Sequence, residues 1–383
     1  MKRLTLLLIT MLFSLPALAQ TPPPVADSTG TPLAPPAAGV PSSQAQPPLA
    51  PYQPNPALAR PMATPSSPDD AAPASSSPPI IHQQISFPDW MNELRHDAIA
   101  QGIRPTTVYY ALGNVYPDPA ILQKDREQPE NKETAQEYWD KMLDVNRIER
   151  GREFYSANRD LLRRISEAYG VRTRYLVALL GIESNYGEGQ GNENIINSLV
   201  TLAYDGRRSE YFRDELIAAM QILDQGNVRI EKMRGSWAGA LGYCQFMPSN
   251  YLKYGQDFDG DGRVDIWSSV PDAVASTAYY LHRNGWQVAE EWGQEVTLRK
   301  PVDPELMGAK VRKSLREWRK LGVREKGGKK LPQNSTMASL LQPDGPEGRS
   351  FLVYNNFHVL TRWNRSTYFA VAVGMLADIL GMR

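Results

Sequence analysis

Residues 172–183 are apolar on nearly every face when they are drawn as a helix. The apolar side chains are Tyr175, Leu176, Val177, Leu179, Leu180 and Ile182. A helix of this kind is stable only when other elements surround it. The chain must therefore build a large body that holds this helix in its interior.

The predicted helix ends at one carboxylate, Glu183, within the sequence Gly-Ile-Glu-Ser-Asn-Tyr-Gly-Glu-Gly-Gln of residues 181–190. A carboxylate on a buried helix loses solvation, so its pKa should rise toward the range of a general acid. The other interpretation is that Glu183 only caps a backbone group at the helix end. The rest of the sequence has to decide between these roles.

Residues 1–19 have the pattern of a signal peptide. Lys2 and Arg3 precede an apolar run that ends at the small-residue cleavage site of residues 17–19. The apolar run is too short to span a membrane as a helix. No cysteine stands at the cleavage site, so we expect an exported protein without a lipid anchor.

Residues 20–85 form a segment rich in proline, alanine and serine, and residues 21–80 alone contain 18 of the 31 prolines. Such a segment cannot bury enough apolar surface to offset its ordering entropy. We expect a disordered, partly extended tether with no binding role of its own.

Residues 86–383 are long enough for a large core, which we expect to be mainly α. Helices are predicted over residues 133–164 with a break near Gly151, and over 172–183, 209–224, 271–284 and 367–380. Residues 293–355 have short apolar runs and turn residues, which predict a small mixed α/β lobe. The formal net charge of +0 argues against a nucleic-acid-binding protein.

Residues 257–265 match the first half of an EF-hand-like calcium loop. Asp257, Asp259 and Asp261 would supply hard oxygen ligands, and Gly262 would allow the sharp turn. The backbone carbonyl of Arg263 would occupy the seventh position of the loop. The sequence therefore predicts one Ca²⁺ site with a structural role.

The calcium-like loop departs from the standard pattern at its end. Position twelve is Ser268, where a bidentate glutamate belongs, and the next acid is Asp272. The sequence from Ser269 to Asp272 also has the pattern of a capping box that opens the next helix. We favour a calcium site that ends at Asp272 over a plain Asp/Gly turn.

Two further segments combine small or amide residues with aromatic ones. In residues 235–248 the backbone can approach closely while Gln245, Phe246 and Met247 project, and such groups suit the polar edges and flat faces of sugars. Residues 354–367 place asparagine beside Trp363. Tight helix packing and turn chemistry explain these segments equally well.

Other chemistries find little support in the sequence. The four histidines are scattered, and no Gly-x-Ser-x-Gly elbow, P-loop or dinucleotide fingerprint is present. Serine-hydrolase, metalloprotease and nucleotide-binding activities are therefore poor interpretations. Cys244 is the only cysteine, so no internal disulfide can form, and we expect it to be a small buried filler.

Taken together and in order, residues 181–187, 235–248, 257–272 and 354–367 resemble the membrane-bound lytic murein transglycosylase B family. The resemblance implies a lysozyme-like helical core that cleaves the MurNAc–GlcNAc β-1,4 bond of peptidoglycan and leaves 1,6-anhydro-MurNAc ends. It makes Glu183 the single catalytic acid/base. It also implies that glycan strands are bound by Ser236, Gln245, Phe246, Met247, Tyr211, Tyr280 and Asn364, and that calcium is held by Asp257, Asp259, Asp261, Arg263 and Asp272.

The resemblance also implies a place and partners. The expected protein acts in the periplasm on peptidoglycan, has cell-wall synthesis proteins as candidate partners, and has no transmembrane segment after cleavage of the signal. Two alternatives remain at this level. One is a hydrolytic muramidase, which needs a second carboxylate such as Glu188 or Glu193 opposite Glu183. The other is a non-catalytic peptidoglycan-binding protein.

Overall fold

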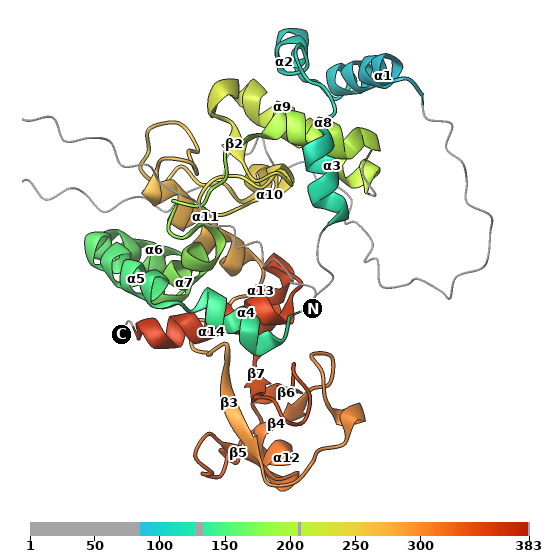
Figure 1. Cartoon of the computed structure of the whole chain (residues 1–383). Helices are drawn as coiled ribbons and strands as arrows, with labels where there is room; N and C mark the ends of the chain where they lie inside the picture. Colours follow the sequence, from blue (N-terminus) through green and yellow to red (C-terminus); the bar gives the residue numbers. More distant parts are fainter. Residues whose placement is uncertain (1–84, 128–132, 206–207, 382–383) are drawn as a thin grey trace, which may run out of the picture. The chain divides into compact units, whose positions relative to one another are not determined.

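The computed structural model describes residues 85–127, 133–205 and 208–381. The predicted signal peptide and all of the predicted tether except Ile85 lie outside these residues. The described helices, traced in Figure 1, are α1 (Phe87–Ala100), α2 (Pro105–Ala111), α3 (Pro119–Arg126), α4 (Ala135–Met142), α5 (Val145–Ala157), α6 (Arg159–Tyr169), α7 (Thr173–Ser184), α8 (Ile195–Asp205), α9 (Ser209–Gln225), α10 (Pro248–Tyr254), α11 (Val270–Arg283), α12 (Leu315–Lys320), α13 (Asn355–Trp363) and α14 (Thr367–Leu380).

The helix α7 lies in the interior of the helical body, as its apolar pattern predicts. Every residue from Tyr175 to Gly181 is buried, and α5, α6, α11 and α14 pack against the helix. Because α14 is itself apolar on most of its faces, it completes the cover of α7. Both helices begin and end within one residue of the predicted positions.

The long helical stretch expected over residues 133–164 is three helices, and the expected break near Gly151 is wrong. The chain breaks before α5, where the Asp144 carboxylate accepts from Arg147 N at 3.1 Å, and again at Asn158 between α5 and α6. Gly151 lies in the middle of α5 and is buried. A side chain there would collide with Tyr186, so the glycine serves packing rather than a break.

The small mixed lobe contains an antiparallel sheet with the strand order β4–β6–β7–β3–β5. These strands are β3 (Gly293–Leu298), β4 (Lys313–Ser314), β5 (Val323–Glu325), β6 (Met337–Leu341) and β7 (Ser350–Val353). They share a separate apolar core with α12, in which Trp318 and Leu340 are fully buried. The lobe expected over residues 293–355 is therefore present (Figure 1).

The lobe also fixes the position of α4. The Asp344 carboxylate, in the turn between β6 and β7, accepts from the backbone N–H groups of Ala135 and Gln136. In the same helix Trp139 packs edge-on against Phe351 of β7 and donates to Tyr368 O at 3.0 Å. Since α4 is held from two sides, the side chains on its other face have defined positions.

The helices α8, α9 and α10 pack together beside the short strands β1 (Glu193–Asn194) and β2 (Arg234–Gly235). Among the described helices, none has both the length and the apolarity needed to cross a membrane.

Candidate active site

Glu183 lies one residue before the end of α7, and its environment matches that of a general acid. Trp363 Nε1, at the end of α13, donates to Glu183 Oε1 at 2.6 Å. Burial raises the pKa of Glu183 to about 8, and the hydrogen bond from Trp363 opposes part of this rise. The residue keeps some exposed surface, so its carboxyl group is poorly solvated yet within reach of a ligand.

The alternative role of Glu183 as a helix cap finds no support in the described residues. The hydrogen bond that its carboxylate accepts comes from the indole of Trp363 and not from a backbone N–H group. The end of α7 is instead satisfied by Asn185 and Tyr186, whose backbone N–H groups donate to Gly181 O and Leu180 O.

The loop after Glu183 is held in an unusual backbone conformation. Asn185 and Tyr186 have φ values of 50° and 60°, in the left-handed region that residues with side chains rarely adopt. Ser184 Oγ fixes the loop because it donates to Tyr243 O at 2.8 Å and accepts from Gly187 N at 3.0 Å. A side chain at Gly187 would meet the Tyr243 ring at 2.2 Å, so only glycine fits there.

The aromatic residues behind Trp363 are more deeply buried than expected. The ring centroids of Phe246 and Tyr280 lie 5.0 and 4.7 Å from that of Trp363. Phe246 is 2% exposed and Tyr280 is 5% exposed. The prediction that Phe246 projects is wrong, because its ring is enclosed by Trp363, Tyr280 and Tyr254.

Gln245 also keeps its side chain inside the protein rather than projecting freely. Its backbone has a φ of 48°, and its Nε2 donates to Gln190 O at 3.0 Å and to Gly242 O at 2.9 Å. Gln190 in turn donates to Trp267 O at 3.1 Å. Residues 235–248 are thereby joined to the loop that follows Glu183, and the amide oxygen of Gln245 remains as an acceptor.

The remaining predicted sugar-binding residues are closer to the surface. Ser236 Oγ accepts from Ala240 N at 3.0 Å, and Met247 is half-buried at the start of α10. Tyr211, on α9, is 44% exposed. Asn364 is exposed directly after α13.

Tyr211 and the segment after α13 lie near each other, although they are far apart in sequence. Burial and Glu215 raise the pKa of Tyr211 to about 12, while the charge of Arg365 opposes the rise. The structure therefore brings Tyr211 within electrostatic range of the residue that follows Asn364.

Two residues near Glu183 were not among those predicted. Trp363 is the hydrogen-bond donor described above, and Tyr138 of α4 is half-buried and lies close to Glu183. Burial, and next the charge of Glu183, raise the pKa of Tyr138 to about 12. Trp363 could have been found from the sequence because it adjoins Asn364, whereas no sequence pattern marks Tyr138.

The carboxylates that a hydrolytic mechanism would need are occupied elsewhere. Glu188 pairs with Arg150 of α5, and Glu193 pairs with Lys124 at 2.9 Å. The pKa of Glu183 is shifted by burial and by Trp363, without a contribution from another carboxylate. Glu188 and Glu193 are therefore each paired with a cation, on α5 and α3 respectively.

The acidic loop gathers part of the predicted calcium ligands. Carboxylate oxygens of Asp257, Asp259 and Asp272 lie within 4.8 Å of one another. Asp261 lies outside this cluster, and its role as a calcium ligand stays a prediction. Asp261 is exposed, and its Oδ1 accepts from Arg263 N at 2.9 Å.

Asp272 does not complete the predicted capping box. Ser269 Oγ accepts from Asp272 N at 3.3 Å, but the Asp272 carboxylate accepts from Phe258 N and Asp265 N, both at 2.8 Å. Asp272 is 1% exposed, and burial raises its pKa to about 6. Three clustered carboxylates, one of them buried, form an all-oxygen set that fits Ca²⁺.

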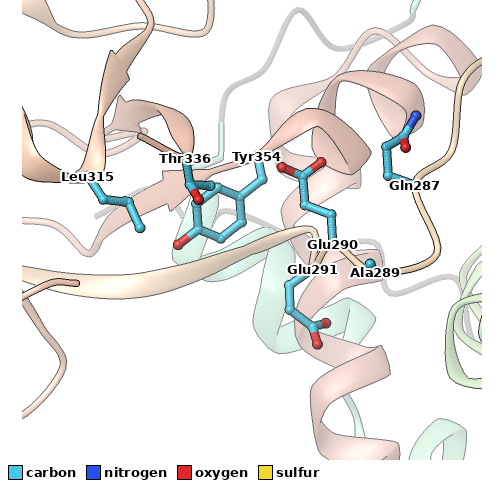
Figure 2. Close-up of a pocket in the computed structure, with 7 residues that line it drawn as sticks. All are labelled: Gln287, Ala289, Glu290, Glu291, Leu315, Thr336 and Tyr354. Atoms are coloured by element: carbon cyan, nitrogen blue, oxygen red, sulfur yellow. The ribbon is translucent and has the colours of Figure 1, made fainter. Parts of the chain in front are cut away.

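A hollow of about 480 Å³ lies at the junction with the mixed lobe (Figure 2). Its carboxylates already have structural partners. Glu291 pairs with Arg172 and Arg174, and burial raises the pKa of Glu290 while the charge of Arg312 opposes the rise. This hollow therefore adds no catalytic group to the site at Glu183.

A mainly helical body and a poorly solvated carboxyl group of raised pKa, held by a tryptophan near the end of a buried helix, are the features of a lysozyme-like enzyme. Comparison with known proteins agrees. Residues 86–378 match the model of the transglycosylase SLT domain, and the chain belongs to this family. It is a lytic transglycosylase of peptidoglycan.

Individual relatives support this assignment. The chain is 32% identical over 251 residues to membrane-bound lytic murein transglycosylase B of Escherichia coli K12. The aligned region covers 64% of this chain and 67% of that one. It is 42% identical to SltB3 of Pseudomonas aeruginosa, solved with NAG-NAM-pentapeptide, over 78% of this chain and 80% of that one, with a TM-score of 0.75. Slt35 of Escherichia coli, solved with calcium, is 28% identical over 76% of this chain and 92% of that one, with a TM-score of 0.67.

Proposed function

We propose that the protein cleaves the β-1,4 bond between MurNAc and GlcNAc and closes the muramyl product into a 1,6-anhydro ring, with Glu183 as its only acid and base. One observation carries the proposal. Glu183 has a raised pKa, and no second carboxylate of the described residues faces it. A hydrolytic glycosidase needs a second carboxyl group about 5 to 9 Å away.

The first step is protonation of the leaving group. With a pKa of about 8, Glu183 is protonated at neutral pH and can donate to the glycosidic oxygen. Because Trp363 Nε1 donates to Oε1, the proton is carried by the other carboxyl oxygen. Bond cleavage then leaves an oxocarbenium-like centre on the muramyl ring and an ionised Glu183.

The second step uses the substrate as its own nucleophile. The N-acetyl carbonyl of the muramyl residue can shield the anomeric carbon, and the ionised Glu183 takes the proton of the C6 hydroxyl. The C6 oxygen then forms the bond to the anomeric carbon, which restores the protonated acid. Ring closure within one sugar benefits from a high effective molarity, so water is outcompeted.

The residues around Glu183 divide into two groups in this proposal. Tyr138, Tyr211 and Asn364 have exposed or half-exposed side chains that can contact the glycan, as have Ser236, Gln245 and Met247. Phe246 and Tyr280 lie behind Trp363 and keep its ring in place. The complex of SltB3 with NAG-NAM-pentapeptide supports a glycan with its peptide as the ligand.

We also propose that Asp257, Asp259 and Asp272 hold one Ca²⁺ with a structural role. The backbone carbonyl of Arg263 is a further candidate ligand. The calcium complex of Slt35 supports this assignment. The ion would bridge the acidic loop and the first turn of α11, and so stabilise the helix that carries Tyr280.

Export to the periplasm is proposed from the signal-like residues 1–19, with residues 20–85 as the tether. The periplasm contains peptidoglycan, which is the proposed substrate.

The product distinguishes the proposal from hydrolysis. Digestion of purified peptidoglycan in heavy-oxygen water should yield 1,6-anhydro-muramyl ends without label, measured by mass spectrometry. A hydrolase would place the heavy oxygen at the new reducing end. Substantial incorporation there would contradict the proposed mechanism, and glycan binding without any cleavage would favour a non-catalytic protein.

A further inference from the structure

Tyr186 follows Glu183 by three residues and turns back into the helical body. Both Asn185 and Tyr186 are in the left-handed region, so the chain reverses directly after α7. The Tyr186 ring then lies between α5 and α7, which pack against each other (Figure 1), and it stacks on Phe154 at 5.5 Å. A non-glycine pair in this conformation is strained, so contacts elsewhere must hold it.

Two glycines make room for this ring. A Cβ at Gly151 of α5 would lie 2.4 Å from Tyr186 Oη, and a Cβ at Gly181 of α7 would lie 2.5 Å from the same atom. Glycine inside a helix costs stability relative to alanine. Both helices therefore carry a glycine, which is unfavourable in a helix, at the position that faces the Tyr186 hydroxyl.

Hydrogen bonds join the ring to the last turn of α7. Tyr186 Oη donates to Arg147 O at 3.1 Å, and Arg147 Nε donates to Gly181 O at 3.1 Å. The same arginine also donates to Met142 O at 2.7 Å, at the end of α4. Arg147 and Asp144 are the charged groups that face the Tyr186 hydroxyl.

We infer that Tyr186 is a positioning residue that fixes the end of α7, so that Glu183 stays against Trp363 and away from water. This inference rests on the proposed role of Glu183. Tyr186 acts through the backbone of α7 and does not touch the substrate bond. Gly151 and Gly181 contribute to this positioning because they leave room for the Tyr186 ring.

The inference explains how a single carboxylate keeps a raised pKa. Among the described residues, Trp363 of α13 donates to Glu183, and Tyr138 of α4 and Cys244 before α10 lie within its electrostatic range; none of the three is a cation. Its pKa therefore depends on burial, which lasts only while the helix end stays in place. Movement of that end would admit water, lower the pKa, and misalign the acid.

The test uses a substitution away from Glu183. Gly151→Ala would force Tyr186 to move, since the added methyl group meets Oη. We expect kcat on purified peptidoglycan to fall about 10- to 100-fold with little change in KM, and the alkaline limb of the pH profile to move to lower pH. Tyr186→Phe keeps the ring and should retain most of the activity.

The double variant makes the test specific. Tyr186→Phe removes the nearest atom that Gly151→Ala meets and leaves Leu380 Cδ2 at 2.9 Å and the ring carbon Cζ at 3.2 Å, so the pair should recover part of the kcat and of the pH limb lost in Gly151→Ala. Gly374→Ala is the matched control, because its methyl group would meet the Trp292 ring at 2.1 Å and not the Tyr186 ring. It should lower the melting temperature without moving the pH limb.

Two results would overturn the inference. One is a folded Gly151→Ala enzyme with wild-type kcat and pH profile. The other is a double variant no more active than Gly151→Ala. If Gly151→Ala does not fold, Tyr186→Leu gives the same readout without added atoms. Activity in Glu183→Gln would instead remove the premise, so failure of the proposed function is recognised separately.

Discussion

At Glu183, the loss of solvation that suits the carboxyl group to acid catalysis also affects the stability of the fold. Its folded pKa of about 8 lies above the ordinary value of 4.5. The stability that comes from the neutral acid is fully present below pH 4.5 and is lost as the pH rises through about 8. At neutral pH, Glu183 is therefore protonated in the interior of the enzyme, and its ionisation at higher pH would destabilise the fold.

Glu183→Gln tests the catalytic and the energetic role together. We expect at least a 100-fold loss of turnover, within the usual range for removal of a general acid. The variant should still bind glycan strands, and it should melt at a higher temperature than the wild type at pH 8, because it cannot ionise. Turnover on purified sacculi and thermal unfolding measure both effects, and substantial residual activity would contradict the assignment.

The pH dependence of the reaction gives a second prediction. Activity should fall as the pH rises through about 8, because the acid must be protonated. Trp363→Phe removes a hydrogen bond that favours the ionised form, so the alkaline limb should move upward by about one pH unit. A limb that stays in place in this variant would show that Trp363 does not set the pKa of Glu183.

The residue scale also shows what a sequence can predict. Glu183 is recognisable because its apolar helix and glycine-rich loop are contiguous in the chain. Its partner Trp363 lies 180 residues away, and Tyr138 is on another helix, so no local pattern links them to it. Phe246 was predicted to project, yet a local alternation of small and large residues cannot tell a ring that faces solvent from one that supports another ring.

Among the elements, apolar helices were predicted more accurately than polar ones. The limits of α7 and α14 follow from patterns of burial that extend along the whole helix. The stretch before α7 is rich in charged residues, and single residues determine where its helices begin and end. Asp144 starts α5 through its side chain, whereas Gly151 sits within the helix because of a tyrosine from another segment. The glycine in the sequence predicts a break at Gly151, whereas the structure has the break at Asp144.

The acidic loop before α11 gives the prediction for this scale. A ligand present at a hundredfold excess over its Kd stabilises the folded state by about 2.7 kcal/mol. Chelation should therefore lower the melting temperature by roughly 4 °C for a body of this size, while turnover at low temperature is kept. Asp257→Ala should remove this dependence on calcium, measured by calorimetry with and without chelator.

Two further variants sharpen the calcium experiment. Asp160→Ala, on the exposed face of α6, controls for the loss of one negative charge. Asp261→Ala decides between two ligand sets: the shift is lost if the EF-hand-like pattern holds, and kept if only the three clustered carboxylates bind the ion. Loss of activity on chelation in a folded protein would contradict a purely structural role.

For the molecule as a whole, the described body begins at Ile85, and the proposed tether would end there. The described body has its own cores, and its first helix is anchored locally: Ser86 Oγ accepts from Asp89 N at 3.3 Å, and Ile85 O accepts from the Tyr204 hydroxyl at 3.2 Å. Phe87 packs edge-on against Tyr204 at 5.1 Å. Nothing in residues 21–80 has a pattern that would add to this packing.

A chain that begins at Ile85 should therefore match the full-length protein in melting temperature and in turnover on isolated sacculi, since the tether contributes only reach. A chain that begins at Met91 is the matched control. It loses the Ser86 cap, Phe87, and the Trp90 contact with Tyr204, and it should melt at a lower temperature because α1 then has neither cap nor aromatic anchor. If the chain from Ile85 folded with an unchanged melting temperature but lost turnover, residues 20–84 would have to take part in substrate binding, and the description of this segment as a spacer would be wrong.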